Sequence, residues 1–139
     1  MVNSMEMRSL DRSTLGPENG FSQLLKPWPA LNSPFKGAWC VVAPGTSTTR
    51  HAHPDYEIFI AMTGEATLSS EGKEITFRQG DIVHFPPHTD HQVINDGAEE
   101  FQMYAVWWDQ ETAGQFLERH DGQDGGHAGQ DGGRDGQEG

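Results

Sequence analysis

Residues 45–64 read GTSTTRHAHPDYEIFIAMTG, and residues 80–95 read GDIVHFPPHTDHQVIN. Each stretch begins with a glycine and places histidines beside a short run of apolar residues. The run YEIFIAM at residues 56–62 sorts its side chains onto two faces with the period of two that a β-strand requires. The two stretches therefore predict short strands that end at turns.

Similar short runs, separated by turn residues, continue on both sides of these stretches. No helical period lies between them, so parallel strands joined by helices are excluded. Short strands at this spacing are typical of an antiparallel sandwich or barrel, so we predict an all-β fold. The expected strands are residues 37–43, 56–62, 66–69, 75–78, 81–85, 91–95 and 101–109.

Five of the seven histidines fall between residues 51 and 91. His51 and His53 are two residues apart, so both rings project from one face of an extended segment. Glu57 follows four residues later, and a histidine from another strand, such as His91, would add a third imidazole. Three imidazoles and one carboxylate suit a divalent ion of the first transition row and leave positions for water or substrate.

Four zones follow from composition. Residues 1–36 contain four prolines and read as an extended leader. Residues 37–109 hold the predicted strands, and residues 110–120 can form one short helix with Asp109 as its N-cap. Residues 121–139 carry eight of the 17 glycines and a single hydrophobic residue, so we expect this tail to be disordered.

Charge and length exclude several classes of protein. The chain has 139 residues, enough for one domain, and its 21 acidic against nine basic residues give a formal charge of −12. Such a surface repels nucleic acid. No stretch is apolar enough to span a membrane, and the N-terminus lacks the apolar segment of a signal peptide, so we expect a cytoplasmic protein. The single cysteine, Cys40, excludes an intramolecular disulfide.

The two opening stretches resemble the two conserved motifs of the cupins. The first matches G-x5-H-x-H-x3-E-x6-G at every fixed position. The second is similar to G-x5-P-x-G-x2-H-x3-N, except that His88 stands where the motif has glycine. The spacer of 15 residues between Gly64 and Gly80 is the short one of single-domain bacterial cupins. The resemblance spans residues 37–108, about half of the chain, and two spaced motifs make it specific.

This resemblance implies a small double-stranded β-helix, the jelly-roll barrel of single-domain type 2 cupins. It also implies one divalent metal ion inside the barrel, which can be Zn, Fe, Mn or Ni. The implied metal ligands are His51, His53, Glu57 and His91. The alternative is a metal-free cupin whose polar residues only line a pocket.

His88 is the departure from the motif. A histidine adopts positive φ less easily than glycine, so the turn must differ or be strained. We consider two roles: an auxiliary base or gate beside the metal, and an exposed loop histidine. The second is the commoner fate of such residues.

The last expected strand carries several aromatic residues that could contact a substrate. Parity leaves two possible inner faces, Tyr104 with Trp108 or Met103 with Trp107. Core packing is the commoner fate of buried aromatic rings. We predict a substrate pocket that includes Trp39, Phe59, Tyr104 and Trp108.

The cupin fold supports many functions, so several remain open. The first is a metal-dependent enzyme of small-molecule, and specifically secondary, metabolism. Fe or Mn would support oxygenase chemistry, and Zn or Ni would act as a Lewis acid in an isomerase or lyase. The second is a non-catalytic sensor or binding module for a small molecule.

A third function comes from a narrower resemblance. The segments HPDYEIFIAMTGEA (residues 53–66) and YAVWWD (residues 104–109) are similar to the cupin domains of methionyl-tRNA-synthetase-like hydrazine synthetases. Those cupins form N–N bonds by rearranging an ester-linked amino-acid intermediate, so this resemblance implies a synthetase-like partner protein. The cupin resemblance also implies a homodimer, paired through the proline-rich leader.

Overall fold

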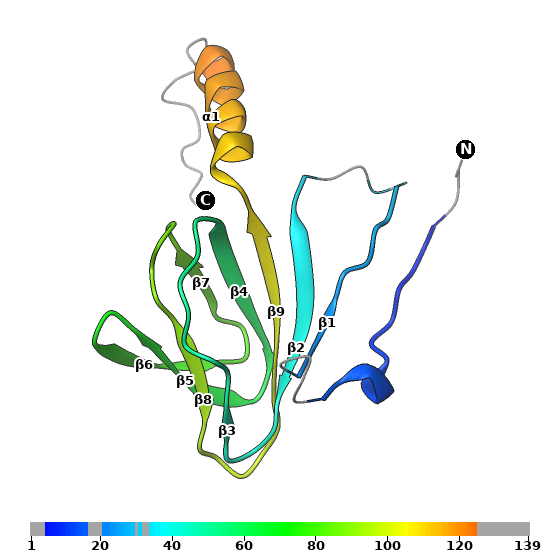
Figure 1. The fold of residues 1–139 in the computed structure, drawn as a ribbon, viewed down its shortest axis with the longest axis vertical. Coiled ribbons are helices and arrows are strands. Elements are labelled where there is room, and N and C mark those ends of the chain that lie inside the picture. Colours follow the sequence, from blue (N-terminus) through cyan, green and yellow to red (C-terminus); the bar gives the residue numbers. More distant parts are fainter. Residues whose placement is uncertain (1–4, 17–20, 30, 32–33, 125–139) are drawn as a thin grey trace. The chain divides into compact units, whose positions relative to one another are not determined.

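The computed structural model describes residues 5–16, 21–29, 31 and 34–124. Two antiparallel sheets face each other and form the predicted all-β barrel (Figure 1). The five-stranded sheet has the order β1 (Ser22–Leu24), β2 (Lys36–Val42), β9 (Phe101–Trp108), β4 (Tyr56–Thr63) and β7 (Ile82–Phe85). The four-stranded sheet has the order β3 (Thr46–Ser47), β8 (Gln92–Asn95), β5 (Glu65–Ser70) and β6 (Lys73–Arg78).

The core lies between the two sheets and draws large apolar side chains from both. Phe101 of β9 and Phe77 of β6 are almost completely buried, and their ring centroids lie 5.7 Å apart. Leu68 of β5 and Val93 of β8 belong to the same cluster. Burial of these side chains from water is the main force that holds the two sheets together.

The register of β9 decides which side chains point into the barrel. Phe101, Met103 and Ala105 are buried in the core, and Trp107 packs against it. Because successive side chains alternate, the residues between them lie on the outer face of the sheet. The inner face therefore carries Met103 and Trp107, which is one of the two alternatives that the sequence had left open.

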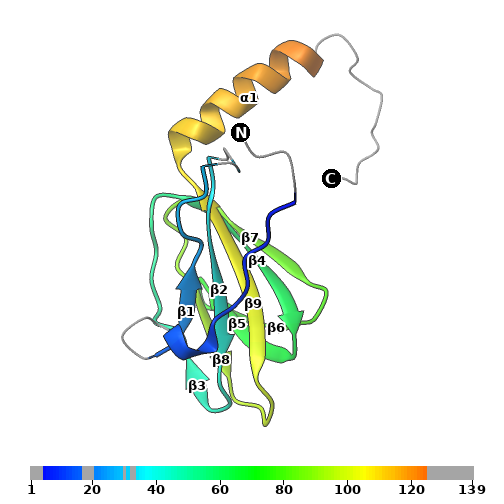
Figure 2. The ribbon, with the colours of Figure 1, turned by 90° about the vertical axis from the view of Figure 1, so that its right-hand side faces the viewer.

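The leader contains more structure than expected. A 3-10 turn, η1 (Arg12–Thr14), and the strand β1 lie within it, and β1 pairs with β2 (Figure 2). Arg12 forms a bidentate ion pair with Glu100, with N–O distances of 2.8 and 3.0 Å. The leader is therefore attached to the five-stranded sheet along part of its length.

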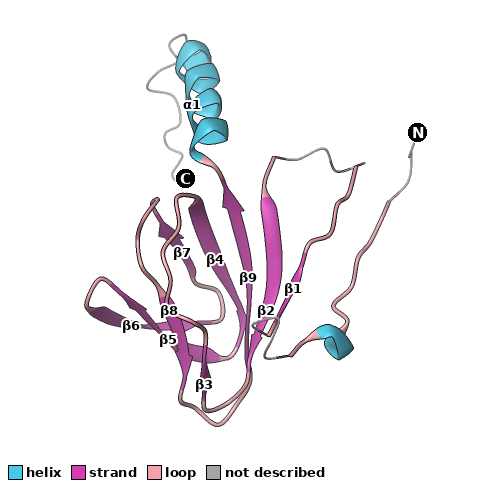
Figure 3. Cartoon of the chain, viewed as in Figure 1, coloured by secondary structure: helices cyan, strands magenta, loops and turns pink. Residues whose placement is uncertain are grey.

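The helix belongs to a compact unit of its own (Figure 3). Helix α1 (Gln110–Asp124) begins where the sequence predicts a helix and ends four residues later than expected. Phe116 and Leu117 remain about half exposed, at 49% and 55%. The prediction of a disordered tail falls mainly on residues 125–139, which lie outside the described residues.

Cys40 lies in β2 and contacts the core. Desolvation, with a smaller contribution from the Glu57 carboxylate, raises the pKa of its thiol to about 12. Because the thiolate is the reactive form, Cys40 is not a nucleophile at neutral pH and acts as a small packing residue.

Candidate metal centre

The four predicted ligand residues come from three parts of the barrel. His51 and His53 stand in the loop between β3 and β4, Glu57 lies in β4, and His91 immediately precedes β8. Two backbone hydrogen bonds join His51 and His91. The N–H of His51 donates to the carbonyl of His91 (3.2 Å), and the N–H of His91 donates to the carbonyl of His51 (3.0 Å). This bridge brings together ligands that are forty residues apart.

The fold brings all four side chains into one cluster. One ligand atom from each residue lies within 4.8 Å of the corresponding atoms of the other three. Zinc bonds to nitrogen or oxygen are about 2.1 Å long, so two ligands of one ion lie at most about 4.2 Å apart. Small side-chain rotations therefore suffice to close the cluster on an ion. His91 and Glu57 are buried, His53 is half-buried and His51 is exposed, so the cluster is open on one side.

Backbone carbonyls orient two of the imidazoles. Nδ1 of His51 lies 2.9 Å from the carbonyl oxygen of Thr49, and Nδ1 of His91 lies 3.0 Å from that of Thr89. A carbonyl only accepts hydrogen bonds, so Nδ1 must carry the proton in each ring. The unprotonated Nε2 of each ring is therefore available as a metal ligand.

The cluster also contains polar atoms without hydrogen bonds. Nε2 of His91 and Nδ1 of His53 are buried and have no hydrogen-bond partner. The Glu57 Oε1 atom lies 2.9 Å from Nε2 of His53 and 3.1 Å from Nε2 of His91, but the second contact lacks hydrogen-bond geometry. Burying unpaired polar atoms costs free energy. A divalent ion among these atoms would remove that cost for His91, so the residues fit a metal.

Aromatic side chains support the buried side of the cluster. The ring of Phe85 stacks on His91 with centroids 4.4 Å apart, and Phe59 meets His91 edge-on at 5.3 Å. Phe59, one of the four predicted pocket residues, therefore lies beside the cluster. Both rings are buried and exclude water from this side.

An ion pair that the sequence analysis did not predict connects the two ligand-bearing segments. Arg50, which precedes His51, pairs with Asp90, which precedes His91. Arg50 also donates to Ser69 Oγ, and Asp90 accepts from the backbone of the turn after β5. One signal could have revealed this pairing: the tripeptides Thr-Arg-His at residues 49–51 and Thr-Asp-His at residues 89–91 differ only by opposite charges.

His88 does adopt the left-handed conformation of the glycine that it replaces, with φ at +66°. Its side chain is exposed and does not belong to the cluster. Its backbone N–H, however, donates a 2.7 Å hydrogen bond to the carbonyl of His53. Its contact with the metal centre is therefore through the backbone.

A His88→Gly variant is expected to be more stable than the wild type by up to about 1 kcal/mol, because glycine relieves the strain of positive φ. A His88→Ala variant keeps that strain and should not be stabilised. Urea denaturation of both variants measures the difference. Equal stabilisation by alanine would show that the side chain, and not the backbone, is responsible.

Three of the four aromatic residues predicted for the pocket lie on the other face of the sheet. Trp39 and Tyr104 form an edge-to-face pair (6.0 Å) over a groove of about 400 Å³ beside the leader. Trp108 stacks on Tyr56, which also stacks on the exposed His84. Tyr104 and Trp108 have the parity opposite to Met103 and the other core residues of β9. Trp39 pairs directly with Tyr104 and therefore lies on the same outer face. Of the four residues predicted for a substrate pocket, only Phe59 therefore lies in the barrel interior beside the cluster.

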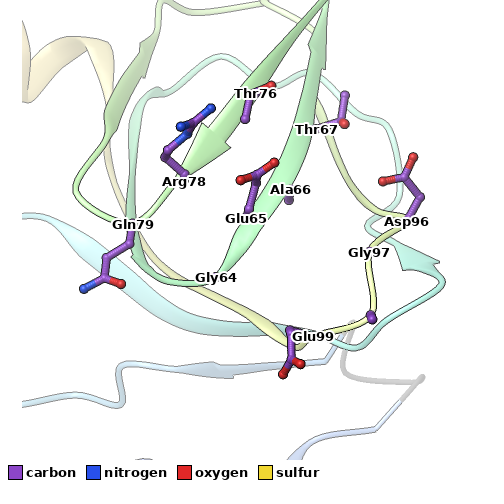
Figure 4. A pocket seen from close by; sticks show the side chains of 11 residues that line it. Gly64, Glu65, Ala66, Thr67, Thr76, Arg78, Gln79, Asp96, Gly97 and Glu99 are labelled. Carbon is purple, nitrogen blue, oxygen red and sulfur yellow. The ribbon is translucent and has the colours of Figure 1, made fainter.

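A pocket of about 520 Å³ lies elsewhere, between β5, β6 and the loop that joins β8 to β9 (Figure 4). Glu65, Arg78, Asp96 and Glu99 are among the residues that line it. None of the four clustered ligand residues takes part. This pocket is therefore separate from the cluster.

Comparison with known proteins agrees with this geometry. The family described as "Cupin domain" matches residues 38–107. A solved cupin 2 conserved barrel domain protein from Salinispora arenicola is 53% identical, with a TM-score of 0.74, covering 85% of this chain and all of that one. The protein plu4264 from Photorhabdus luminescens is 36% identical, with a TM-score of 0.71, covering 85% and 99% of the two chains.

Curated relatives are more distant. The oxalate-binding protein of Thermotoga maritima is 28% identical over 64 residues, which are 45% of this chain and 53% of that protein. This chain spans about half the length, or less, of the curated relatives that it matches. Among the described residues, no helix combines the length and apolar character needed to cross a membrane.

Proposed function

This chain belongs to the cupin family, and we propose that it binds one divalent transition metal ion and uses that ion to act on a small molecule. The observation that carries the proposal is the cluster of His51, His53, Glu57 and His91, whose ligand atoms lie within 4.8 Å of one another. The buried and unpaired Nε2 of His91 supports it. Four protein ligands leave one or two positions of a five- or six-coordinate ion to water or substrate.

A metal ion bound here would supply Lewis-acid chemistry if it is Zn or Ni, and redox chemistry if it is Fe or Mn. The chain's own residues perform the other tasks. Thr49 and Thr89 orient two imidazoles through their carbonyls, and Phe59 and Phe85 keep water away from the buried side. The exposed His51 lies on the side from which a small molecule can approach.

A second candidate function is binding without turnover. The relative from Thermotoga maritima is named for binding oxalate, a small dicarboxylate. A carboxylate is a good ligand for a metal ion with an open position. Binding and catalysis use the same cluster and differ only in whether the bound molecule is changed.

Metal analysis tests the proposal. We expect protein purified without added metal to retain about one ion per chain, or to regain it from Zn, Fe(II), Mn or Ni after chelation. The identity of the retained ion separates the Lewis-acid from the redox class, and oxygen consumption with Fe(II) tests the oxygenase function directly. Failure of every metal to bind in stoichiometric amount would refute the whole proposal.

A further inference from the structure

One row of side chains crosses the five-stranded sheet at the level of the metal ligand Glu57. The register pairs Glu57 of β4 with Trp107 of β9 on one side and with Phe85 of β7 on the other. Trp107 in turn pairs with Lys36, the first residue of β2. Directly paired residues of adjacent strands project from the same face of a sheet.

This row lies on the inner face of the barrel. Phe85 and Glu57 are buried, and Trp107 packs against the core. In β2, Val42 and Ala38 are buried, Val42 within the core cluster, and Lys36 has the same parity as both. The row was not predicted from the sequence, because the parity of β9 decides it.

The row is closed at one end and open at the other. At the β7 end, Phe85 is buried and stacks on His91. Towards β2, Trp107 is only half-buried and Lys36 is exposed. Adjacent strands lie about 4.8 Å apart, so the backbone of Lys36 stands roughly 10 Å from that of Glu57. Trp107 and then Lys36 therefore follow Glu57 in the direction in which the row becomes exposed.

The charge of Lys36 favours an anion at this position. The chain carries −12 overall and has nine basic residues. Arg12 and Arg50 are engaged in ion pairs, whereas Lys36 forms no ion pair with any residue that the structure describes. An unpaired ammonium group at the exposed end of this row attracts negatively charged ligands to it.

We propose that Trp107 and Lys36 determine the substrate class: a small planar molecule with two anionic groups. One anionic group binds the metal, the planar body lies against Trp107, and the second anionic group meets the Lys36 ammonium. This inference rests on the proposed metal site and assigns a class of ligand to it. Trp107 contributes apolar and stacking contact, and Lys36 contributes a charge-assisted hydrogen bond.

Two probes of the same size and shape test the assignment. Terephthalate has two carboxylates, and 4-(hydroxymethyl)benzoate has one carboxylate and a neutral hydroxyl in place of the second. Titration calorimetry of both on metal-loaded protein should show at least about tenfold tighter binding of terephthalate, the usual effect of a hydrogen bond to a charged group. A Lys36→Met variant should lose this preference and bind the monoanion as the wild type does.

Further variants separate charge from packing. Lys36→Arg should keep the preference, and Lys26→Met, at a lysine beside the outer groove, should leave both affinities unchanged. Trp107→Leu should weaken both probes equally, and Trp107→Phe should restore part of that loss. Metal content is measured for every variant, so that loss of the ion is distinguished from loss of the ligand.

Clear results would overturn the inference. If metal-loaded wild type binds neither probe, or Lys36→Met retains the preference for terephthalate, the assigned ligand class is wrong. Unchanged affinity in Trp107→Leu would remove the role of that ring. If the wild type binds no metal at all, the proposed function itself fails. That failure is recognised from the metal content, whereas failure of the ligand class is seen on protein that does bind metal.

Discussion

A His51→Ala variant is expected to bind metal at least about a hundredfold more weakly than the wild type. Residues that only orient a metal ligand already change affinity by 10–100-fold, so loss of a ligand itself should cost no less. His51 is exposed, and its backbone hydrogen bonds with His91 do not depend on the side chain. The barrel should therefore remain folded. Competition with a chromogenic chelator measures the affinity, and circular dichroism measures the fold.

The matched control for this experiment is His84→Ala. His84 is also an exposed histidine of the barrel, but it stacks on Tyr56 on the outer face. The His84→Ala variant should retain full metal affinity. A His91→Ala variant should lose metal as well, but it also removes a side chain that is only 2% exposed, so its stability must be measured beside its affinity. Full metal occupancy in His51→Ala would show that the ligand set is wrong.

A Phe77→Ala variant is expected to lose about 3–5 kcal/mol of unfolding free energy, which is the usual cost of removing a buried phenylalanine ring. Phe77 is 2% exposed and packs on Phe101, which comes from the opposite sheet. The truncation therefore opens a cavity at the centre of the barrel. Urea denaturation should be done on metal-depleted protein, because a bound ion would add its own stabilisation.

Ile75→Ala provides the control in the same strand. Ile75 is 55% exposed, so its truncation should cost less than about 1 kcal/mol. A similar loss for the two variants would contradict the burial difference. A loss below about 1 kcal/mol for Phe77→Ala would show that the two sheets do not close on this ring.

The motif glycines illustrate what local sequence predicts well. Gly45, Gly64 and Gly80 all adopt positive φ, as expected for turns between strands. Gly64 has a second requirement, because a Cβ there would lie 2.5 Å from the carbonyl oxygen of Glu100. The sequence predicts the turn, but only the structure shows this close approach to a residue 36 positions away.

The partners expected from the resemblances stay predictions. The ligand class proposed for Lys36 and Trp107 bears on the synthetase-like partner. A planar dianion differs in charge from the ester-linked amino acid that such a partner would supply. The two probes described above therefore also help to choose among the functions of the metal site.

The sequence by itself predicted seven of the nine described strands and the turns between them, because a period of two and turn residues are local properties. The four clustered residues came from the resemblance to two spaced motifs. The tertiary structure decided which aromatic ring shares the inner face with Glu57. Trp107 and Trp108 are adjacent, and a shift of one residue in register exchanges their faces. Register depends on pairing between β9, β4 and β2, which lie far apart in the chain. The row from Glu57 to Lys36 exists only after those strands have paired.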